Sequence, residues 1–139
     1  MATIFERIIA GELPCAKVYE DELIFAFMDA GQVNPGHVIV ATKKPFETIM
    51  DADEASACAL MAVAHRIARA VQAEFQPPGM TLLQANRPAG WQTVPHLHMH
   101  VLPRWMGDSN FVSVVGETRV LPEELPVTFQ RLLPYFKNL

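Results

Sequence analysis

The hydrophobic and polar positions of this chain change their period several times, and each change marks a predicted element. Alternation at period two indicates strands, and apolar residues three and four apart indicate helices. Glycine and proline residues separate these segments. The pattern predicts a short helix over 4–10, strands over 17–20, 23–29 and 37–42, a long helix ending at 76, and strands over 80–85 and 95–103.

The long helix has the clearest pattern of all. Asp51 is its expected N-cap, because Glu54 follows three residues later in the capping-box arrangement. Pro77-Pro78-Gly79 ends it. Its apolar face consists of Ala57, Leu60, Met61, Ala64, Ile67, Ala68, Val71 and Phe75.

The order of these elements indicates the fold class. Neighbouring strands with short connections favour an antiparallel sheet with helices on one face. We therefore expect an α+β fold with about five antiparallel strands, one long helix and one or two short helices. Prolines interrupt the C-terminal part, so only short helical pieces near 125–133 are expected there. The chain reads as a single domain over 1–139, with a core over 1–103 and an irregular tail over 104–139.

Composition narrows the functional classes. The 139 residues are 50% hydrophobic and 19% charged, and the formal net charge of −4 argues against a nucleic-acid-binding protein. Cys15 and Cys58 form neither a CxxC pair nor a zinc pattern, which indicates free thiols in a reducing compartment. The N-terminus lacks the apolar run of a signal peptide, and no stretch is long and apolar enough for a membrane. We expect a cytoplasmic protein without membrane or nucleic-acid partners.

Three histidines at every second position, His96, His98 and His100, are the main chemical feature of the chain. On a strand all three imidazoles point to one face. The residues between and after them, Leu97, Met99 and Val101, are apolar and point to the other face. One face therefore suits a core, and the other carries chemistry.

Three interpretations of this row are open. A metal ion could bind two neighbouring imidazoles but not the outer pair, which lie about 13 Å apart, so it would need further ligands, with His37 the obvious candidate. Alternatively, a neutral imidazole could act as a nucleophile or as an acid–base catalyst. The row could also be structural, although burying three imidazoles requires many hydrogen-bond partners.

These residues carry a resemblance to a known family. The segment from His96 to Leu102 matches the pattern His-φ-His-φ-His-φ-φ, with φ apolar, of the histidine triad superfamily. The likeness extends over about the first hundred residues, through Ile4-Phe5, Ile8-Ile9-Ala10-Gly11-Glu12-Leu13-Pro14, Val18-Tyr19-Glu20-Asp21, Ala26-Phe27-Met28-Asp29, Pro35-Gly36-His37, Ala89-Gly90 and Gln92-Thr93-Val94.

The resemblance implies both a fold and a reaction. It implies a five-stranded antiparallel sheet, paired into a homodimer, that hydrolyses or transfers nucleotidyl groups at the α-phosphate of purine nucleotides or dinucleoside polyphosphates. His98 would attack phosphorus and carry the nucleotidyl group. His96 would orient its neighbour, His100 would donate to a phosphate oxygen, and His37 would support the triad.

The resemblance also implies a substrate pocket. Asp29 matches the position that contacts ribose hydroxyls, and a carboxylate can accept two such hydrogen bonds. Gln92 and Thr93 precede the triad and could reach phosphate or the leaving group. The apolar positions that match a base pocket, and that could equally be core, are Ile4, Phe5, Ile8 and Phe27. No tightly bound cofactor is implied, although Mg²⁺ can accompany a polyphosphate substrate.

The chain departs from the family pattern at two places. Many relatives carry Cys-x-x-Cys near the N-terminus as half of a zinc site, whereas this chain has Thr3-Ile4-Phe5-Glu6, so we expect no structural zinc. Trp91 interrupts the usual Ala-Gly-Gln before the triad, which leaves Gln84 or Asn86 as the amide near the scissile bond. The C-terminal tail resembles branches that act on dinucleoside polyphosphates such as diadenosine tetraphosphate.

Three functional hypotheses remain. The favoured one is a nucleotide hydrolase or transferase with a covalent His98 intermediate, acting as a dinucleoside polyphosphate hydrolase, a phosphoramidase or a phosphorylase. The second is a module that senses purine nucleotides with weak phosphoramidase turnover. The third is a metal-dependent enzyme built on the histidine cluster.

Overall fold

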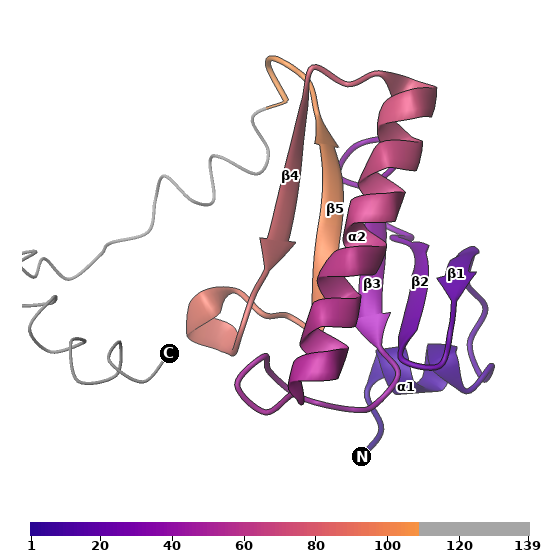
Figure 1. The fold of residues 1–139 in the computed structure, drawn as a ribbon, viewed down its shortest axis with the longest axis vertical. Coiled ribbons are helices and arrows are strands. Elements are labelled where there is room, and N and C mark those ends of the chain that lie inside the picture. Colours follow the sequence, from indigo (N-terminus) through magenta and orange to yellow (C-terminus); the bar gives the residue numbers. More distant parts are fainter. Residues whose placement is uncertain (109–139) are drawn as a thin grey trace, which may run out of the picture. The chain divides into compact units, whose positions relative to one another are not determined.

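The computed structural model describes residues 1–108, which form one compact unit. Every element predicted in this range is present, with boundaries shifted by at most three residues (Figure 1). The predicted helical pieces near 125–133 lie outside the described residues, and the single domain over 1–139 stays a prediction. The elements are α1 (Ile4–Ile9), β1 (Lys17–Glu20), β2 (Ile24–Met28), β3 (Val38–Thr42), α2 (Glu54–Phe75), β4 (Gly79–Gln84), the 3₁₀ turn η1 (Pro88–Gly90) and β5 (His98–Arg104).

The five strands form one antiparallel sheet in the order β1-β2-β3-β5-β4. β5 therefore lies in the interior of the sheet, between β3 and β4. Val38 at the start of β3 is opposite Val101 of β5, and Ala41 is opposite His98. The predicted α+β class, with a five-stranded antiparallel sheet, one long helix and a short one, is confirmed.

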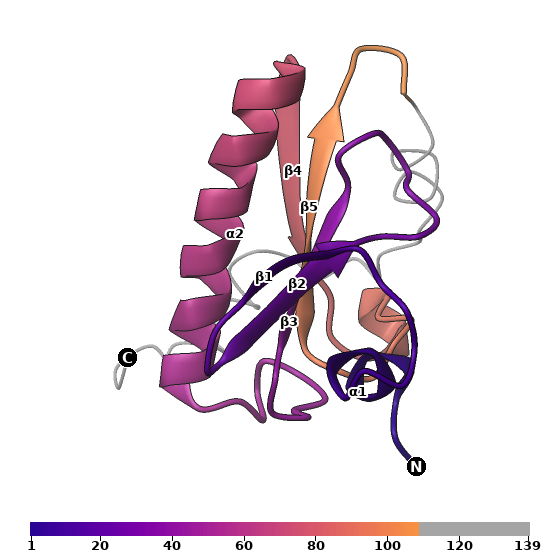
Figure 2. The same ribbon diagram turned by 90° about the vertical axis from the view of Figure 1, so that its right-hand side faces the viewer.

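The two helices cover opposite faces of the sheet (Figure 2). We call the face under α2 the helix face and the other the histidine face. The expectation of helices on one face is wrong. β3 is buried at all five positions, so both of its faces need a covering layer. α1 supplies the second layer through Phe5, which packs with Phe25, Phe27, Ile39 and Ala41.

The core of the helix face is aliphatic. α2 directs one stripe of buried residues at the sheet, and Leu60, Ala64, Ile67 and Val71 of the predicted face belong to it. Met61 and Phe75, predicted on the same face, are exposed, whereas Val63 is buried. The cluster comprises Ile24, Ala26, Val38, Val40, Leu60, Val63, Ala64, Ile67, Val71, Leu97, Met99 and Val101. Among the described residues, no helix is long and apolar enough to cross a membrane.

The N-cap of α2 is Asp53 rather than the expected Asp51. The Asp53 carboxylate accepts a hydrogen bond from the Ser56 backbone N–H at 2.7 Å. Asp51 instead closes the preceding turn, where it accepts from the backbone N–H and the hydroxyl of Thr48. Both aspartates suit a cap by residue type, so the sequence pattern alone could not distinguish them.

Candidate active site

Two neighbouring strands bring the candidate histidines together. On β5, His98 and His100 lie opposite Ala41 and Ile39 of β3, and all four side chains belong to the histidine face. His37 directly precedes β3, and its ring centroid lies 5.1 Å from that of His100. The site is therefore built on the interior of the sheet, where strand pairing holds it rigidly.

His96 precedes β5, whose first residue is His98, although the predicted strand began at residue 95. The alternation of side chains nevertheless holds across this junction. The intervening Leu97, Met99 and Val101 lie in the core under α2. The sequence pattern thus gave the correct face for each residue.

The ring of His98 is oriented by a backbone carbonyl. Its Nδ1 lies 2.6 Å from the carbonyl oxygen of His96. A carbonyl can only accept, so Nδ1 carries the proton and Nε2 of the neutral ring has a free lone pair. The Phe5 ring stands edge-on to His98, with centroids 4.8 Å apart, and fixes its tilt. Burial lowers the pKa of His98, which keeps the ring neutral.

The side chain of His96 is fully buried and acts as a brace. Its Nε2–H donates to the carbonyl oxygen of Thr42 at 2.6 Å, which leaves Nδ1 to accept from the Thr3 hydroxyl at 3.4 Å. Thr3 also forms a capping box with Glu6 at the start of α1. His96 therefore orients His98 through its backbone carbonyl, while its imidazole ties α1 to β3.

His37 and His100 form a directional pair. The Val33 backbone N–H donates to Nδ1 of His37 at 3.3 Å, so the proton of the neutral ring is on Nε2. That Nε2–H donates to Nδ1 of His100 at 2.9 Å, which leaves Nε2–H of His100 as a free donor. Burial and the neighbouring histidines lower the pKa of His100 to about 4.

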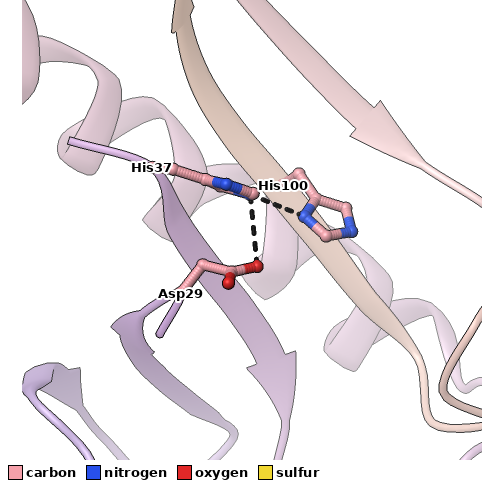
Figure 3. Close-up of side chains that lie close together, drawn as sticks. All are labelled: Asp29, His37 and His100. Carbon is pink, nitrogen blue, oxygen red and sulfur yellow. Dashed lines mark hydrogen bonds and ion pairs between the residues drawn. The ribbon is translucent and has the colours of Figure 1, made fainter. Parts of the chain in front are cut away.

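Asp29 completes this group on the side of His37 (Figure 3). Its Oδ2 lies 3.6 Å from Nε2 of His37, and its Oδ1 accepts from the Gly31 backbone N–H at 2.8 Å. Burial lowers the pKa of His37, and the Asp29 carboxylate opposes that shift. The carboxylate is half-buried and remains reachable for a substrate hydroxyl.

The loop between Asp29 and His37 depends on a glycine. Gly36 has a φ of +93°, and a Cβ there would lie 3.1 Å from the Phe75 ring and 3.3 Å from Pro103. Both the conformation and the space therefore require glycine. The turn places His37 at the start of β3, where its carbonyl accepts from the Asp29 backbone N–H.

A cavity of about 400 Å³ lies beside Asp29. The structure brings three of the predicted substrate residues to its wall, namely Ile8, Phe27 and Asp29. Phe5 is buried under the histidines, whereas Ile4 is exposed and does not line the cavity. The remaining wall consists of residues that sequence reasoning did not place at the site, namely Pro14, Cys15, Ala16, Met28, Ala30 and Gln32.

Of the two predicted phosphate contacts before the triad, Gln92 has other partners. The Gln92 side chain is buried, accepts from the Arg87 backbone N–H at 2.6 Å and donates to the Glu47 carbonyl at 2.6 Å. It therefore holds the turn around η1. Thr93 is exposed, and a contact of its hydroxyl with substrate stays a prediction.

Gln84 and Asn86 pair with each other through two amide hydrogen bonds of 2.9 and 2.7 Å. Gln84 is opposite Met99, which places it on the helix face of the sheet. Asn86 also accepts from the Ile49 backbone N–H at 2.8 Å. In this arrangement the pair ties β4 to the loop before α2, and a role at the scissile bond stays a prediction for either amide.

Sequence reasoning missed two residues that support the site, Thr3 and Asn34. Thr3 was readable as part of a Thr-x-x-Glu capping box, although nothing in the sequence pairs it with His96. Asn34 donates to the Pro103 carbonyl and to Asp108, so it fastens the His37 loop to the end of β5. No local sequence pattern predicts such a long-range contact.

Comparison with known proteins shows which family this chain belongs to. The family model described as the HIT domain matches residues 10–106. The chain belongs to the HIT domain family. HIT proteins act on nucleotides, and the match assigns this chain to the class of nucleotide hydrolases and transferases.

Individual HIT proteins resemble this chain in sequence and in structure. The chain is 40% identical to "Protein hit" of Bacillus subtilis, covering 80% of this chain and 77% of that protein. It is 32% identical to an "AP-4-A phosphorylase" of Mycobacterium tuberculosis, covering 84% of this chain but only 60% of the phosphorylase. A HIT family structure from Bacillus subtilis superposes with a TM-score of 0.80 at 34% identity, covering 100% of this chain and 98% of that one.

Proposed function

We propose that this HIT protein cleaves purine nucleotides or dinucleoside polyphosphates, such as diadenosine tetraphosphate, at the α-phosphate. His98 is the nucleophile and carries the nucleotidyl group. The observation that supports this assignment is the hydrogen bond from Nδ1–H of His98 to the His96 carbonyl. It leaves the Nε2 lone pair of a neutral imidazole free for attack, which is what nucleophilic catalysis by histidine requires.

The proposed reaction has two steps. In the first, Nε2 of His98 forms a bond to the α-phosphorus while the bond to the leaving oxygen breaks, and the leaving group keeps the electron pair. The free Nε2–H of His100 donates to a non-bridging oxygen and stabilises its charge. In the second, water attacks phosphorus, the N–P bond breaks, its electron pair returns to Nε2, and a proton passes to solvent. Orthophosphate as acceptor would make the enzyme a phosphorylase.

Substrate orientation follows from the neighbouring groups. The cavity lined by Ile8 and Phe27 offers an apolar wall for a base, and Asp29 at its edge can accept two ribose hydroxyl hydrogen bonds. These three residues lie on the histidine face, because Phe27 belongs to its cluster, Ile8 packs against that cluster and Asp29 contacts His37. The proposal includes no tightly bound cofactor, and Mg²⁺ enters only with a polyphosphate substrate.

The decisive test is substitution of the nucleophile. His98→Asn removes the attacking lone pair, and we expect turnover to fall by at least about 10³-fold while nucleotide still binds. Wild type incubated with labelled substrate should yield an AMP adduct that is acid-labile and base-stable, as a phosphoramidate is, and the variant should not. The exposed His65 provides the matched control, since His65→Asn should change neither result.

A product assay then separates the possible activities. Diadenosine tetraphosphate, an AMP phosphoramidate and ADP, each with and without orthophosphate, distinguish hydrolase, phosphoramidase and phosphorylase. Full turnover by His98→Asn would exclude the nucleophile assignment. Turnover no faster than background with the whole panel would favour a sensing module instead.

The same proposal covers assembly and location. β4 is an edge strand of the sheet and leaves Leu82 exposed, which supports the inferred homodimer with a paired sheet. Sedimentation at micromolar concentration tests that state. Cys15 and Cys58 are free and exposed, which suits the cytoplasmic location that we infer.

A further inference from the structure

Three metal-ligating side chains converge at the edge of the candidate site (Figure 3). One ligand atom each from Asp29, His37 and His100 lies within 4.8 Å of the other two. Nε2 of His37 is 2.9 Å from Nδ1 of His100 and 3.6 Å from Oδ2 of Asp29. Neither His96 nor the nucleophile His98 is part of this group.

We propose that Asp29, His37 and His100 bind one divalent transition-metal ion, with Zn²⁺ as the preferred ion, and that this ion inhibits the enzyme. Two imidazole nitrogens and one carboxylate oxygen form a ligand set typical of zinc and of neighbouring transition metals. Mg²⁺ and Ca²⁺ prefer oxygen ligands, so the set discriminates against them. This ion is an occasional occupant and not a tightly bound cofactor.

The distances suit such an ion after a small adjustment. Ligands about 2.0–2.1 Å from a tetrahedral zinc ion lie roughly 3.4 Å from one another. The two closest separations, 2.9 and 3.6 Å, lie on either side of that value. Three protein ligands on one side leave the fourth position for water. His37 and His100 are held by paired strands, so their nitrogens already converge before an ion arrives.

Metal binding at His37 perturbs a neighbouring hydrogen bond, and this perturbation can be detected. The neutral His37 ring carries its proton on Nε2, because the Val33 N–H faces Nδ1. Coordination through Nε2 moves that proton to Nδ1. The Nδ1–H and the Val33 N–H, whose nitrogens lie 3.3 Å apart, are then two donors facing each other. The loop 30–36 must shift to separate the two donors. The cost lowers the affinity and makes the Val33 amide a reporter of metal binding.

Inhibition rests on the proposed function. The ion would occupy the Asp29 carboxylate, which the substrate ribose needs. Metal and nucleotide should therefore exclude each other. An ion at this place connects nucleotide turnover to the concentration of free zinc.

The test measures binding first and turnover second. Zn²⁺ titrated calorimetrically into the full chain, and Co²⁺ followed by its visible absorption, should each bind once per chain. His37→Gln should abolish binding, and Asp29→Asn should weaken it at least about tenfold. The control His65→Gln removes a histidine elsewhere and should bind as wild type. In the wild type, Zn²⁺ should shift the Val33 amide resonance, and a chelator should reverse this shift together with the loss of turnover.

The variant His98→Asn separates this inference from the proposed function. It should retain Zn²⁺ binding, since His98 is not a ligand, even though its turnover is lost. If His98→Asn kept its turnover, the nucleophile assignment would fail while the metal site would stand. Loss of Zn²⁺ binding in His98→Asn, unchanged binding in both Asp29→Asn and His37→Gln, or no binding by wild type would each overturn the metal site.

Discussion

The four histidines of the site are the same residue type, but each has a different hydrogen-bonding environment. Both nitrogens of His96 and of His37 have partners within the protein. His98 and His100 each use only Nδ1, the first as a donor and the second as an acceptor. The first therefore presents a lone pair and the second an N–H. The His96 backbone carbonyl sets the tautomer of His98, and the His37 side chain sets that of His100.

The brace role of His96 predicts a large effect on stability. His96→Ala removes a fully buried ring and leaves the Thr42 carbonyl without its donor. We expect the free energy of unfolding to fall by about 2–4 kcal/mol in urea denaturation. His65→Ala, at an exposed position of α2, should change it by less than about 0.5 kcal/mol. Equal losses in the two variants would contradict the brace.

The sequence predicted side-chain orientation well, because that follows a local rule. It predicted hydrogen-bond partners poorly, because those partners are distant in the chain. Alternation placed the histidines on one face and Leu97 and Met99 on the other, as observed. Residue type could not show that the Gln92 amide forms hydrogen bonds with the backbone of Glu47 and Arg87. The partners of a polar side chain are set by tertiary packing, which no spacing along the chain reveals.

At the scale of elements, the turn between β4 and β5 has a strained backbone. Arg87 has φ of 63° and ψ of 164°, and Trp91 has φ of 70°, so two side-chain-bearing residues adopt conformations that favour glycine. The buried Gln92 side chain holds the turn closed through Arg87. The turn lies on the same side of the sheet as α1, opposite α2 (Figure 2).

This strain predicts a stabilising substitution. Arg87→Gly relieves a conformation that costs a side-chain-bearing residue about 1–3 kcal/mol, against a smaller entropic cost of glycine. We expect a net gain of about 1 kcal/mol, seen as a higher urea midpoint with an unchanged slope. Arg87→Ala keeps the Cβ, so it should gain nothing. A glycine variant no more stable than the alanine variant would refute the strain argument.

The elements themselves were readable from sequence because apolar periodicity and prolines mark them. The sequence did not show which helix covers which face of the sheet. A six-residue helix such as α1 has too short a pattern to indicate which side of a sheet it joins. That choice follows from strands β2 and β3 being buried on both faces, a property of the assembled sheet.

At the scale of the whole molecule, three buried histidines and the half-buried His100 make the fold sensitive to acid. Burial lowers the pKa of His37, His96, His98 and His100, in the last case to about 4. The folded rings hold protons less tightly than unfolded rings, whose ordinary pKa is about 6.5. The unfolded state therefore binds more protons below that pH, and stability declines as pH falls from 6.5 toward 4.

This linkage can be measured. His100 alone should contribute on the order of 3 kcal/mol to the loss of unfolding free energy between pH 7 and pH 4. His100→Asn cannot titrate, so a plot of its unfolding free energy against pH should be flatter in this window. The hydrogen-bonded carboxylates Asp51 and Asp53 also have lowered pKa values, but their stabilisation is lost only below about pH 4. A loss confined to that lower range, and equal in both proteins, would mean that the carboxylates and not the imidazoles set the acid limit of this fold.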